Sequence, residues 1–456
     1  MRGEANRSGK RPRRFRLWHG PVAVFLVCLV GAQMFRWYWN YAFHQRVASL
    51  GDRGYPVTFE QLEAWYVRSP PGQDNAAELV LEAGDSYVDR LDRDEIKRLP
   101  LLGHGVTPRR GWALPADVKD VMERLVADNQ DSLALLHRAA RLEQCCYPMD
   151  WSPSQATPYP PLDVIRNGQL LCLSALLAFD DDRAEAGVES LLAALCIARS
   201  AGRVPTVYGS LVCMGIRRQA ASSLEWGLSR VVLVEQQTRR LQEAMGTEDS
   251  LEGLTRSLVG HLCTHLPRFE CPQLYREDYL PSATMLKAYE ALGLGAKEGA
   301  LFVDMMESYL DVTRKPFSQW QGATAALAVE WDETLRGCVL LSPGGRGAFS
   351  GLLMGHVESR ARSEAARAAL AVERYRLSEG TLPESLTDLV PRFLEGVPAD
   401  PYAGGPMLYE SRAGGFVVYS VGLDGRDDGG RETPEEKYDV TFTIKRKEAT
   451  DDAGNR

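Results

Sequence analysis

Residues 164–205 decide the fold class of this chain, and their sequence is VIRNGQLLCLSALLAFDDDRAEAGVESLLAALCIARSAGRVP. Apolar residues recur in its first half at three- and four-residue steps, as the buried face of a helix requires. Three consecutive aspartates, 180–182, end this helix and cap a second one at 184–201. Gly202 and Pro205 follow at the positions that favour a helix end. The stretch therefore predicts a mainly α-helical body.

Helices are also expected on both sides of this stretch. Upstream, repeated apolar positions predict one long amphipathic helix over 115–143, and five prolines near 148–161 exclude its continuation. Downstream, the expected helices occupy 207–228, 234–246, 249–266, 283–313 and 317–340. No fixed period relates them, so an irregular array of helical repeats and a plain bundle are both open interpretations.

The N-terminus has the pattern of a membrane anchor. Residues 1–18 form a basic tail with seven arginines and lysines against one acid. Residues 19–41 follow as an apolar stretch that ends in an aromatic cluster, Trp37 to Tyr41. About 18 apolar residues in a helix span roughly 27 Å, enough for a hydrocarbon core. The pattern predicts a single transmembrane helix with an interfacial aromatic belt.

The charge distribution predicts how this anchor is oriented. A basic flank is retained in the cytoplasm, so residues 42–341 are expected outside the bacterial cytoplasmic membrane as a helical region. Val30-Gly-Ala32 also fits a cleavage site, and a cleaved signal peptide is the alternative to a retained anchor. The whole chain carries −8 and its first 17 residues +6, so the body is acidic at −14. An acidic body argues against nucleic acid as a partner.

The region after residue 341 has a different pattern. A Gly-rich linker is expected at 342–350, followed by a small α+β domain at 351–446 and a disordered tail at 447–456. The domain should begin with a long helix, 352–378, that Gly380 ends. Strands are expected at 406–409, 415–420 and 438–444.

The order of four short motifs in 351–446 resembles the globular domain of the type II secretion system major pseudopilin, the protein G family. These motifs are Leu370-Ala-Val-Glu-Arg-Tyr375, Pro398-Ala-Asp-Pro-Tyr402, Phe416-Val-Val-Tyr-Ser420 and Gly422-Leu-Asp-Gly425 with Tyr438-Asp-Val440. The resemblance implies calcium as the cofactor, bound in the loop after the third motif. It implies four candidate metal ligands: Asp424, Asp427, Asp428 and Asp439. Carboxylates on a glycine-rich turn suit this hard cation.

The N-terminus departs from a prepilin. Prepilins are cut before the apolar segment and carry Glu at the fifth position after the cut, where this chain has Phe25 after Gly20-Pro21. About 300 residues, mostly helical, also separate the anchor from the pseudopilin-like end. We therefore expect no polymerisation into a pseudopilus.

Cysteine and histidine residues could form a disulfide or a zinc site. An exported body permits disulfides, and Cys263 and Cys271 form the most plausible pair. His261 and His265 have the spacing of zinc ligands on a helix, but no Glu follows His261 as the metalloprotease pattern needs. No catalytic constellation and no small-molecule substrate are identified.

The sequence thus predicts a non-catalytic, membrane-anchored protein of the bacterial envelope. Its helical region would bind protein partners from the envelope or the type II secretion apparatus, and calcium would stabilise its C-terminal end. The alternative is an exported hydrolase acting on an envelope polymer, with catalytic residues far apart in sequence.

Overall fold

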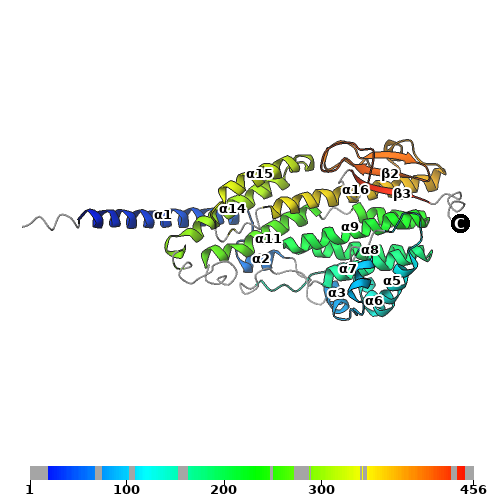
Figure 1. Cartoon of the computed structure of the whole chain (residues 1–456), viewed down its shortest axis with the longest axis horizontal. Helices are drawn as coiled ribbons and strands as arrows, with labels where there is room; N and C mark the ends of the chain where they lie inside the picture. Colours follow the sequence, from blue (N-terminus) through cyan, green and yellow to red (C-terminus); the bar gives the residue numbers. More distant parts are fainter. Residues whose placement is uncertain are drawn as a thin grey trace, which may run out of the picture. The chain divides into compact units, whose positions relative to one another are not determined.

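The fold is mainly helical, with one apolar helix near the N-terminus and a small three-stranded sheet near the C-terminus (Figure 1). This confirms the predicted fold class at that level. The computed structural model describes residues 19–66, 74–101, 108–151, 163–246, 250–271, 287, 289–338, 341, 347–432 and 439–446. The basic tail 1–18, most of the proline-rich break, residues 342–346 of the linker and the tail 447–456 lie outside the described residues.

Two units can be distinguished from contacts within the chain. The first comprises Met1–Tyr55, His265–Asp304 and Gly337–Ser342. The second comprises Pro56–Thr264, Met305–Arg336 and Pro343–Arg456. Most of the helical body and the C-terminal sheet therefore belong to one unit, while the predicted domain boundaries themselves stay a prediction.

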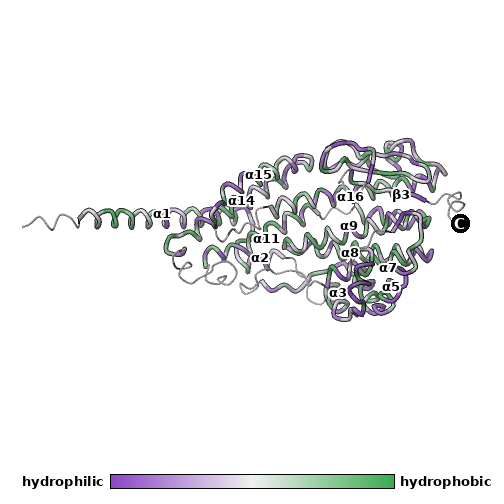
Figure 2. The backbone as a smooth tube through the Cα atoms, viewed as in Figure 1, coloured by the Kyte–Doolittle hydropathy of each residue, from purple (hydrophilic) through white to green (hydrophobic). Residues whose placement is uncertain are grey.

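The first unit contains α1 (His19–Asp52), the only helix in the described part of the chain that is long and apolar enough to cross a membrane. The most apolar window of the candidate span, Gly20–Asp52, has a mean hydropathy of 1.5, and none of this window is buried. Figure 2 shows the hydrophobic colouring of this helix. Its C-terminal half packs within the unit: the ring centroids of Phe43 and Phe269 lie 6.5 Å apart, and Arg46 pairs with Asp304 at 2.6 Å.

The second unit begins with short helices. They are α2 (Phe59–Trp65), α3 (Ala76–Asp85), α4 (Arg93–Arg98), α5 (Ala116–Asp128) and α6 (Gln130–Ala139). The predicted single helix over 115–143 is wrong, because Asn129 separates α5 from α6. The buried Asn129 amide donates to Leu125 O and to Val88 O and accepts from Val88 N, so it satisfies backbone groups of a neighbouring segment.

Three long helices form the centre of this unit: α7 (Asp163–Asp180), α8 (Ala184–Arg203) and α9 (Val207–Arg230). The two helices predicted in residues 164–205 are confirmed, with the break at the aspartates. Asp182 adopts a positive φ of 57°, which turns the chain between them. Further along the chain are α10 (Glu235–Gly246), α11 (Ser250–Glu270), α14 (Leu294–Thr313), η3 (Phe317–Gln319) and α15 (Trp320–Thr334). Two of these, α11 and α14, extend across both units.

The C-terminal region starts with α16 (Ala348–Glu379), which ends at Gly380 with a φ of 75°, as predicted. A 3-10 turn, η5 (Leu386–Leu389), precedes the antiparallel strands β1 (Leu408–Arg412), β2 (Gly415–Ser420) and β3 (Val440–Lys445). The sheet order is β1-β2-β3, and α16 lies against β2 and β3 (Figure 1). The first strand begins two residues later than predicted.

One hydrophobic core joins the sheet to the helices of the second unit. It contains Leu171 of α7, Leu195 of α8, Leu224 of α9, Ala369 of α16 and Phe416 of β2. The alanines of α16 allow this helix to approach α9 and α10 on one side and the sheet on the other. The C-terminal loops are therefore held on a rigid base.

Candidate metal site

The predicted calcium ligands lie in the loop between β2 and β3, which we call the glycine loop (its described residues are 421–432 and 439). Its first end is fixed by Asp400, a carboxylate only 1% exposed. Ser420 Oγ donates to Asp400 Oδ1 at 2.6 Å, and Val421 N donates to Asp400 Oδ2 at 3.0 Å. These charge-assisted hydrogen bonds define the direction in which the chain leaves β2.

The other end of the glycine loop is fixed by Glu432. Its carboxylate accepts from the hydroxyls of Thr441 at 2.6 Å and Thr443 at 2.8 Å, both on β3. Arg110 lies between Glu432 and Glu225 of α9, at 2.8 and 2.9 Å. Burial raises the pKa of Glu225, and the Arg110 guanidinium opposes that shift. The loop is thus tied at both ends, to its own sheet and to the helices.

Three of the four predicted ligands, Asp427, Asp428 and Asp439, interact with one another. Asp439, 9% exposed, accepts from Gly430 N at 2.7 Å and from Asp428 N at 3.4 Å. Burial raises its pKa, and the charges of Asp428 and Asp427 act in the same direction. The Oδ2 atom of Asp428 is buried and has no hydrogen-bond partner in the described part of the chain.

Asp424, the fourth predicted ligand, is placed differently. Its side chain is exposed, and Oδ1 accepts from the backbone N–H of Arg426 at 3.0 Å, as in an ordinary Asx turn. Burial raises the pKa of Asp439, and the neighbouring charges that add to this rise are those of Asp428 and Asp427. Asp439 therefore interacts electrostatically with Asp427 and Asp428, whereas Asp424 accepts a hydrogen bond within its own turn.

Gly430 holds the loop in the conformation that gathers these carboxylates. It has a φ of 64°, and a Cβ atom there would lie 3.0 Å from both an Arg412 nitrogen and a Val417 methyl group. Its N–H donates to Asp439 and its carbonyl accepts from Arg412. The positive φ and the lack of room for a Cβ atom both favour glycine at this position.

The carboxylates supply oxygen ligands, which are the ligands that a hard cation prefers. Calcium takes six to eight oxygen ligands, and carboxylates with backbone carbonyls are its usual protein donors. The partnerless Oδ2 of Asp428 and the mutual repulsion of three carboxylates are two features that a bound cation would satisfy. Among the described residues, no three His, Cys, Asp or Glu side chains are already grouped around one metal-sized position. A cation would therefore require the carboxylates to draw closer together.

The other candidate metal ligands are used in packing. The His261 ring lies 5.0 Å from the ring of Phe349, and the His265 ring 6.0 Å from that of Phe302. The predicted disulfide between Cys263 and Cys271 is wrong, because both thiols are free. Cys263 is buried and donates to Thr58 O at 3.3 Å, whereas Cys271 is exposed. Eight residues of helical rise, about 12 Å, exceed the reach of a disulfide.

Two residues of this site, Asp400 and Glu432, were not among the predicted candidates. Asp400 belongs to the Pro398–Tyr402 motif, and an acid between two prolines that precedes a strand was a usable signal. Glu432 carried no signal, since its partners Arg110 and Thr443 are distant in sequence.

Comparisons with known proteins do not assign this chain to a family. No family model, no curated protein sequence and no solved structure matches the chain.

Proposed function

We propose that this protein is anchored by α1 in the bacterial cytoplasmic membrane and acts outside the cytoplasm by binding other proteins, without catalysis of its own. Its C-terminal part would be a pseudopilin-G-like structure stabilised by calcium, and its partners would be components of the type II secretion apparatus or the envelope. The observation that supports its calcium part is that Asp427 and Asp428 act electrostatically on Asp439, while the buried Oδ2 atom of Asp428 has no hydrogen-bond partner among the described residues.

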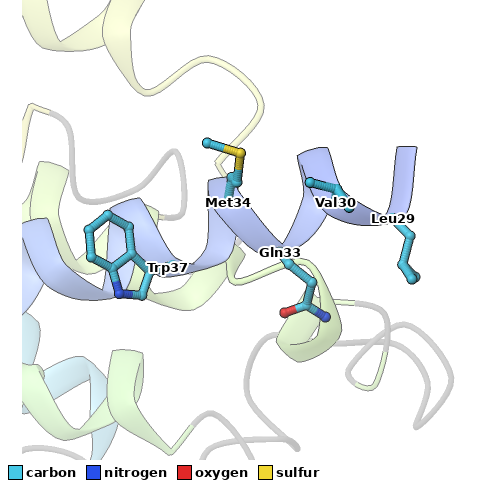
Figure 3. Close-up of a pocket in the computed structure, with 5 residues that line it drawn as sticks. All are labelled: Leu29, Val30, Gln33, Met34 and Trp37. Atoms are coloured by element: carbon cyan, nitrogen blue, oxygen red, sulfur yellow. The ribbon is translucent and has the colours of Figure 1, made fainter. Parts of the chain in front are cut away.

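The exposed apolar surface of α1 supports the membrane anchor. Val27 is 71% exposed and Met34 67% exposed, and a soluble helix rarely leaves such a surface in water. Leu29, Val30, Gln33, Met34 and Trp37 line a shallow hollow on this helix (Figure 3). A bilayer would cover these side chains, and Trp37, Tyr38 and Tyr41 would lie at its interface.

The order of C-terminal elements supports the pseudopilin resemblance. A long helix ended by a left-handed glycine, a 3-10 turn, a hairpin, a glycine loop and a final strand follow one another, as the four motifs imply. This part shares its core with α9 and α10. A fragment of residues 351–446 would expose that core, so tests should use the full chain.

Calcium binding is tested by unfolding the full chain in detergent, with calcium or with a chelator. We expect calcium to raise the melting temperature by about 2 °C or more, since a ligand at 100 times its Kd stabilises the native state by about 2.7 kcal/mol. Asp428→Asn should abolish the shift, because it removes a ligand charge at a position where Oδ2 has no hydrogen-bond partner among the described residues.

Asp128→Asn is the matched control, because this exposed acid pairs with Arg90 at 3.5 Å on the helical body. It should leave the calcium shift unchanged. Asp424→Asn compares the ligand set implied by the resemblance with the set gathered in the structure, and we expect it to keep most of the shift. A wild-type melting temperature that calcium does not change would remove calcium from the proposal.

The partner class is tested by cross-linking in bacterial membranes followed by purification of the full chain. Recovery of secretion-apparatus proteins would support that association, and recovery of other envelope proteins alone would contradict it. The alternative function, an exported hydrolase, has no specific observation in its favour among the described residues.

A further inference from the structure

A second cluster of charged residues lies inside the second unit, between α9, α10 and α16. Arg217 of α9 is only 9% exposed, yet its guanidinium is bonded to two neutral oxygens. It donates to Met245 O of α10 at 2.9 Å and to Ser363 Oγ of α16 at 3.1 Å. A buried guanidinium normally has a carboxylate partner, because burial of an unpaired charge is costly.

His356 of α16 lies at the same place. It is 4% exposed, and its Nε2 atom has no hydrogen-bond partner in the described residues. The rings of Trp320 and Phe317, each 6.0 Å away, stack near the imidazole. Burial lowers the pKa of His356 to about 4, and the charges of Arg360 and Arg217 lower it further. The imidazole is therefore neutral at pH 7, and its Nε2 atom lacks a hydrogen-bond partner among the described residues.

The carboxylate nearest to this cluster is already engaged twice. Glu364 pairs with Arg360 at 2.8 Å and with Arg367 at 2.7 Å. The field at Arg217 also includes the positive charge of Arg199. The charge of Glu364 favours the charged form of Arg217, whereas the charges of Arg199 and Arg360 oppose it.

The C-terminus of α10 offsets only part of the positive charge of Arg217. Met245 O is one of the last carbonyls of that helix, where the helix dipole is equivalent to about −0.5 elementary charge. Arg217 therefore acts as a helix cap, but a full negative charge is still missing.

The cluster encloses a small cavity. Arg217, Met245, His356, Ser359, Arg360, Ser363 and Glu364 line it. Its volume is about 10 Å³, which admits one water-sized particle. This size excludes phosphate, sulfate and organic acids.

We propose that this cavity is a binding site for a single halide ion, chloride in the cell envelope, held by the guanidinium groups of Arg217 and Arg360 and by polar hydrogens of His356 and Ser359. The ion supplies the negative charge that Arg217 lacks and a partner for the His356 edge. It also connects α9 to α16, the helix on which the sheet packs. The site is independent of the calcium loop.

The first test is thermal unfolding of the full chain in detergent with a chelator present, in sodium chloride or sodium gluconate at equal ionic strength. We expect a saturable rise of about 2 °C in chloride for the wild type. Arg217→Gln and Arg360→Gln should remove it. Arg362→Gln is the control, because Arg362 pairs with Glu358 on the same helix, outside the cavity, and this variant should retain the rise.

The second test needs no variant and so does not depend on variants folding. Crystals of the wild type grown in sodium bromide should show an anomalous peak in the cavity, within hydrogen-bond distance of Arg217. A peak there supports the proposal. Ordinary water density without anomalous signal, or equal melting temperatures in the two salts, would overturn it.

Discussion

The glycine loop holds neighbouring carboxylates and the Arg217 cavity holds neighbouring guanidinium groups, and the two regions differ in how these charges are surrounded. In the loop, Asp427 is exposed and Asp428 is half-buried, and backbone N–H groups donate to Asp439. In the cavity, Arg217 is buried between helices, and the Glu364 carboxylate that lines the cavity pairs with both Arg360 and Arg367. Water can screen the first cluster but not the second. A missing counter-ion therefore matters more in the cavity.

The two regions also differ in how visible they are in sequence. The loop carboxylates stand within 16 residues of one another, and their glycine context made them recognisable. The cavity combines Arg217 with residues about 140 positions later, from His356 to Glu364. On α16 these residues belong to an ordinary amphipathic pattern. Only the packing of α9 against α16 makes them a cluster.

The largest expected effect is that of Arg110→Met, which would give the loop region an unpaired buried charge like that of the cavity. Arg110 is the partner of Glu225, a carboxylate that burial already destabilises. We expect the variant to lower the free energy of unfolding by about 3 kcal/mol at pH 7, as breaking a buried pair does. Urea unfolding at pH 7 measures this loss.

Arg90→Met is the matched control for that variant. Arg90 pairs with Asp128 at 3.5 Å and its side chain is 73% exposed, so its loss should cost at most about 0.5 kcal/mol. Equal losses for the two variants would show that Glu225 is not held by Arg110.

A second prediction concerns the pH dependence of the cavity. The pKa of His356 is about 4 in the fold and about 6.5 in the unfolded chain, so the unfolded chain binds the proton first as pH falls. Stability should be lost as pH decreases from 6.5 to 4, by about 3 kcal/mol in total. His356→Phe should flatten this slope in chloride-free buffer.

The measurement is the free energy of unfolding in urea at several pH values, compared between wild type and variant. His137→Phe is the control, because burial also lowers the pKa of His137, but the arginines of the cavity do not act on it. Parallel pH profiles for the wild type and His356→Phe would contradict the prediction. Added chloride should reduce the wild-type slope, because an anion near His356 favours its protonated form.

The fold was more predictable than the sites, for physical reasons. Helices α7, α8, α9 and α16 have repeating apolar positions and caps that act locally, and the predicted ranges agree with the structure within a few residues. The division between α5 and α6 was not predictable, because the Asn129 amide satisfies Val88, 41 residues away. The hydrogen bonds between Ser420 and Asp400 and between Arg110 and Glu432 likewise join residues that are distant in sequence.

The smallest expected effect separates charge from calcium in the glycine loop. Asp439→Asn removes one of three mutually repelling charges, and the raised pKa of Asp439 shows that the fold disfavours its ionised form. The amide oxygen can still accept from Gly430 N, while the 3.4 Å bond from Asp428 N is lost. These two effects oppose each other, so we expect the unfolding free energy in chelator at pH 7 to change by at most about 0.5 kcal/mol. In calcium the same variant should lose the stabilisation seen in the wild type. A large loss already in chelator would mean that Asp439 serves the loop through its hydrogen bonds alone, and the carboxylates would then need no cation to explain their arrangement.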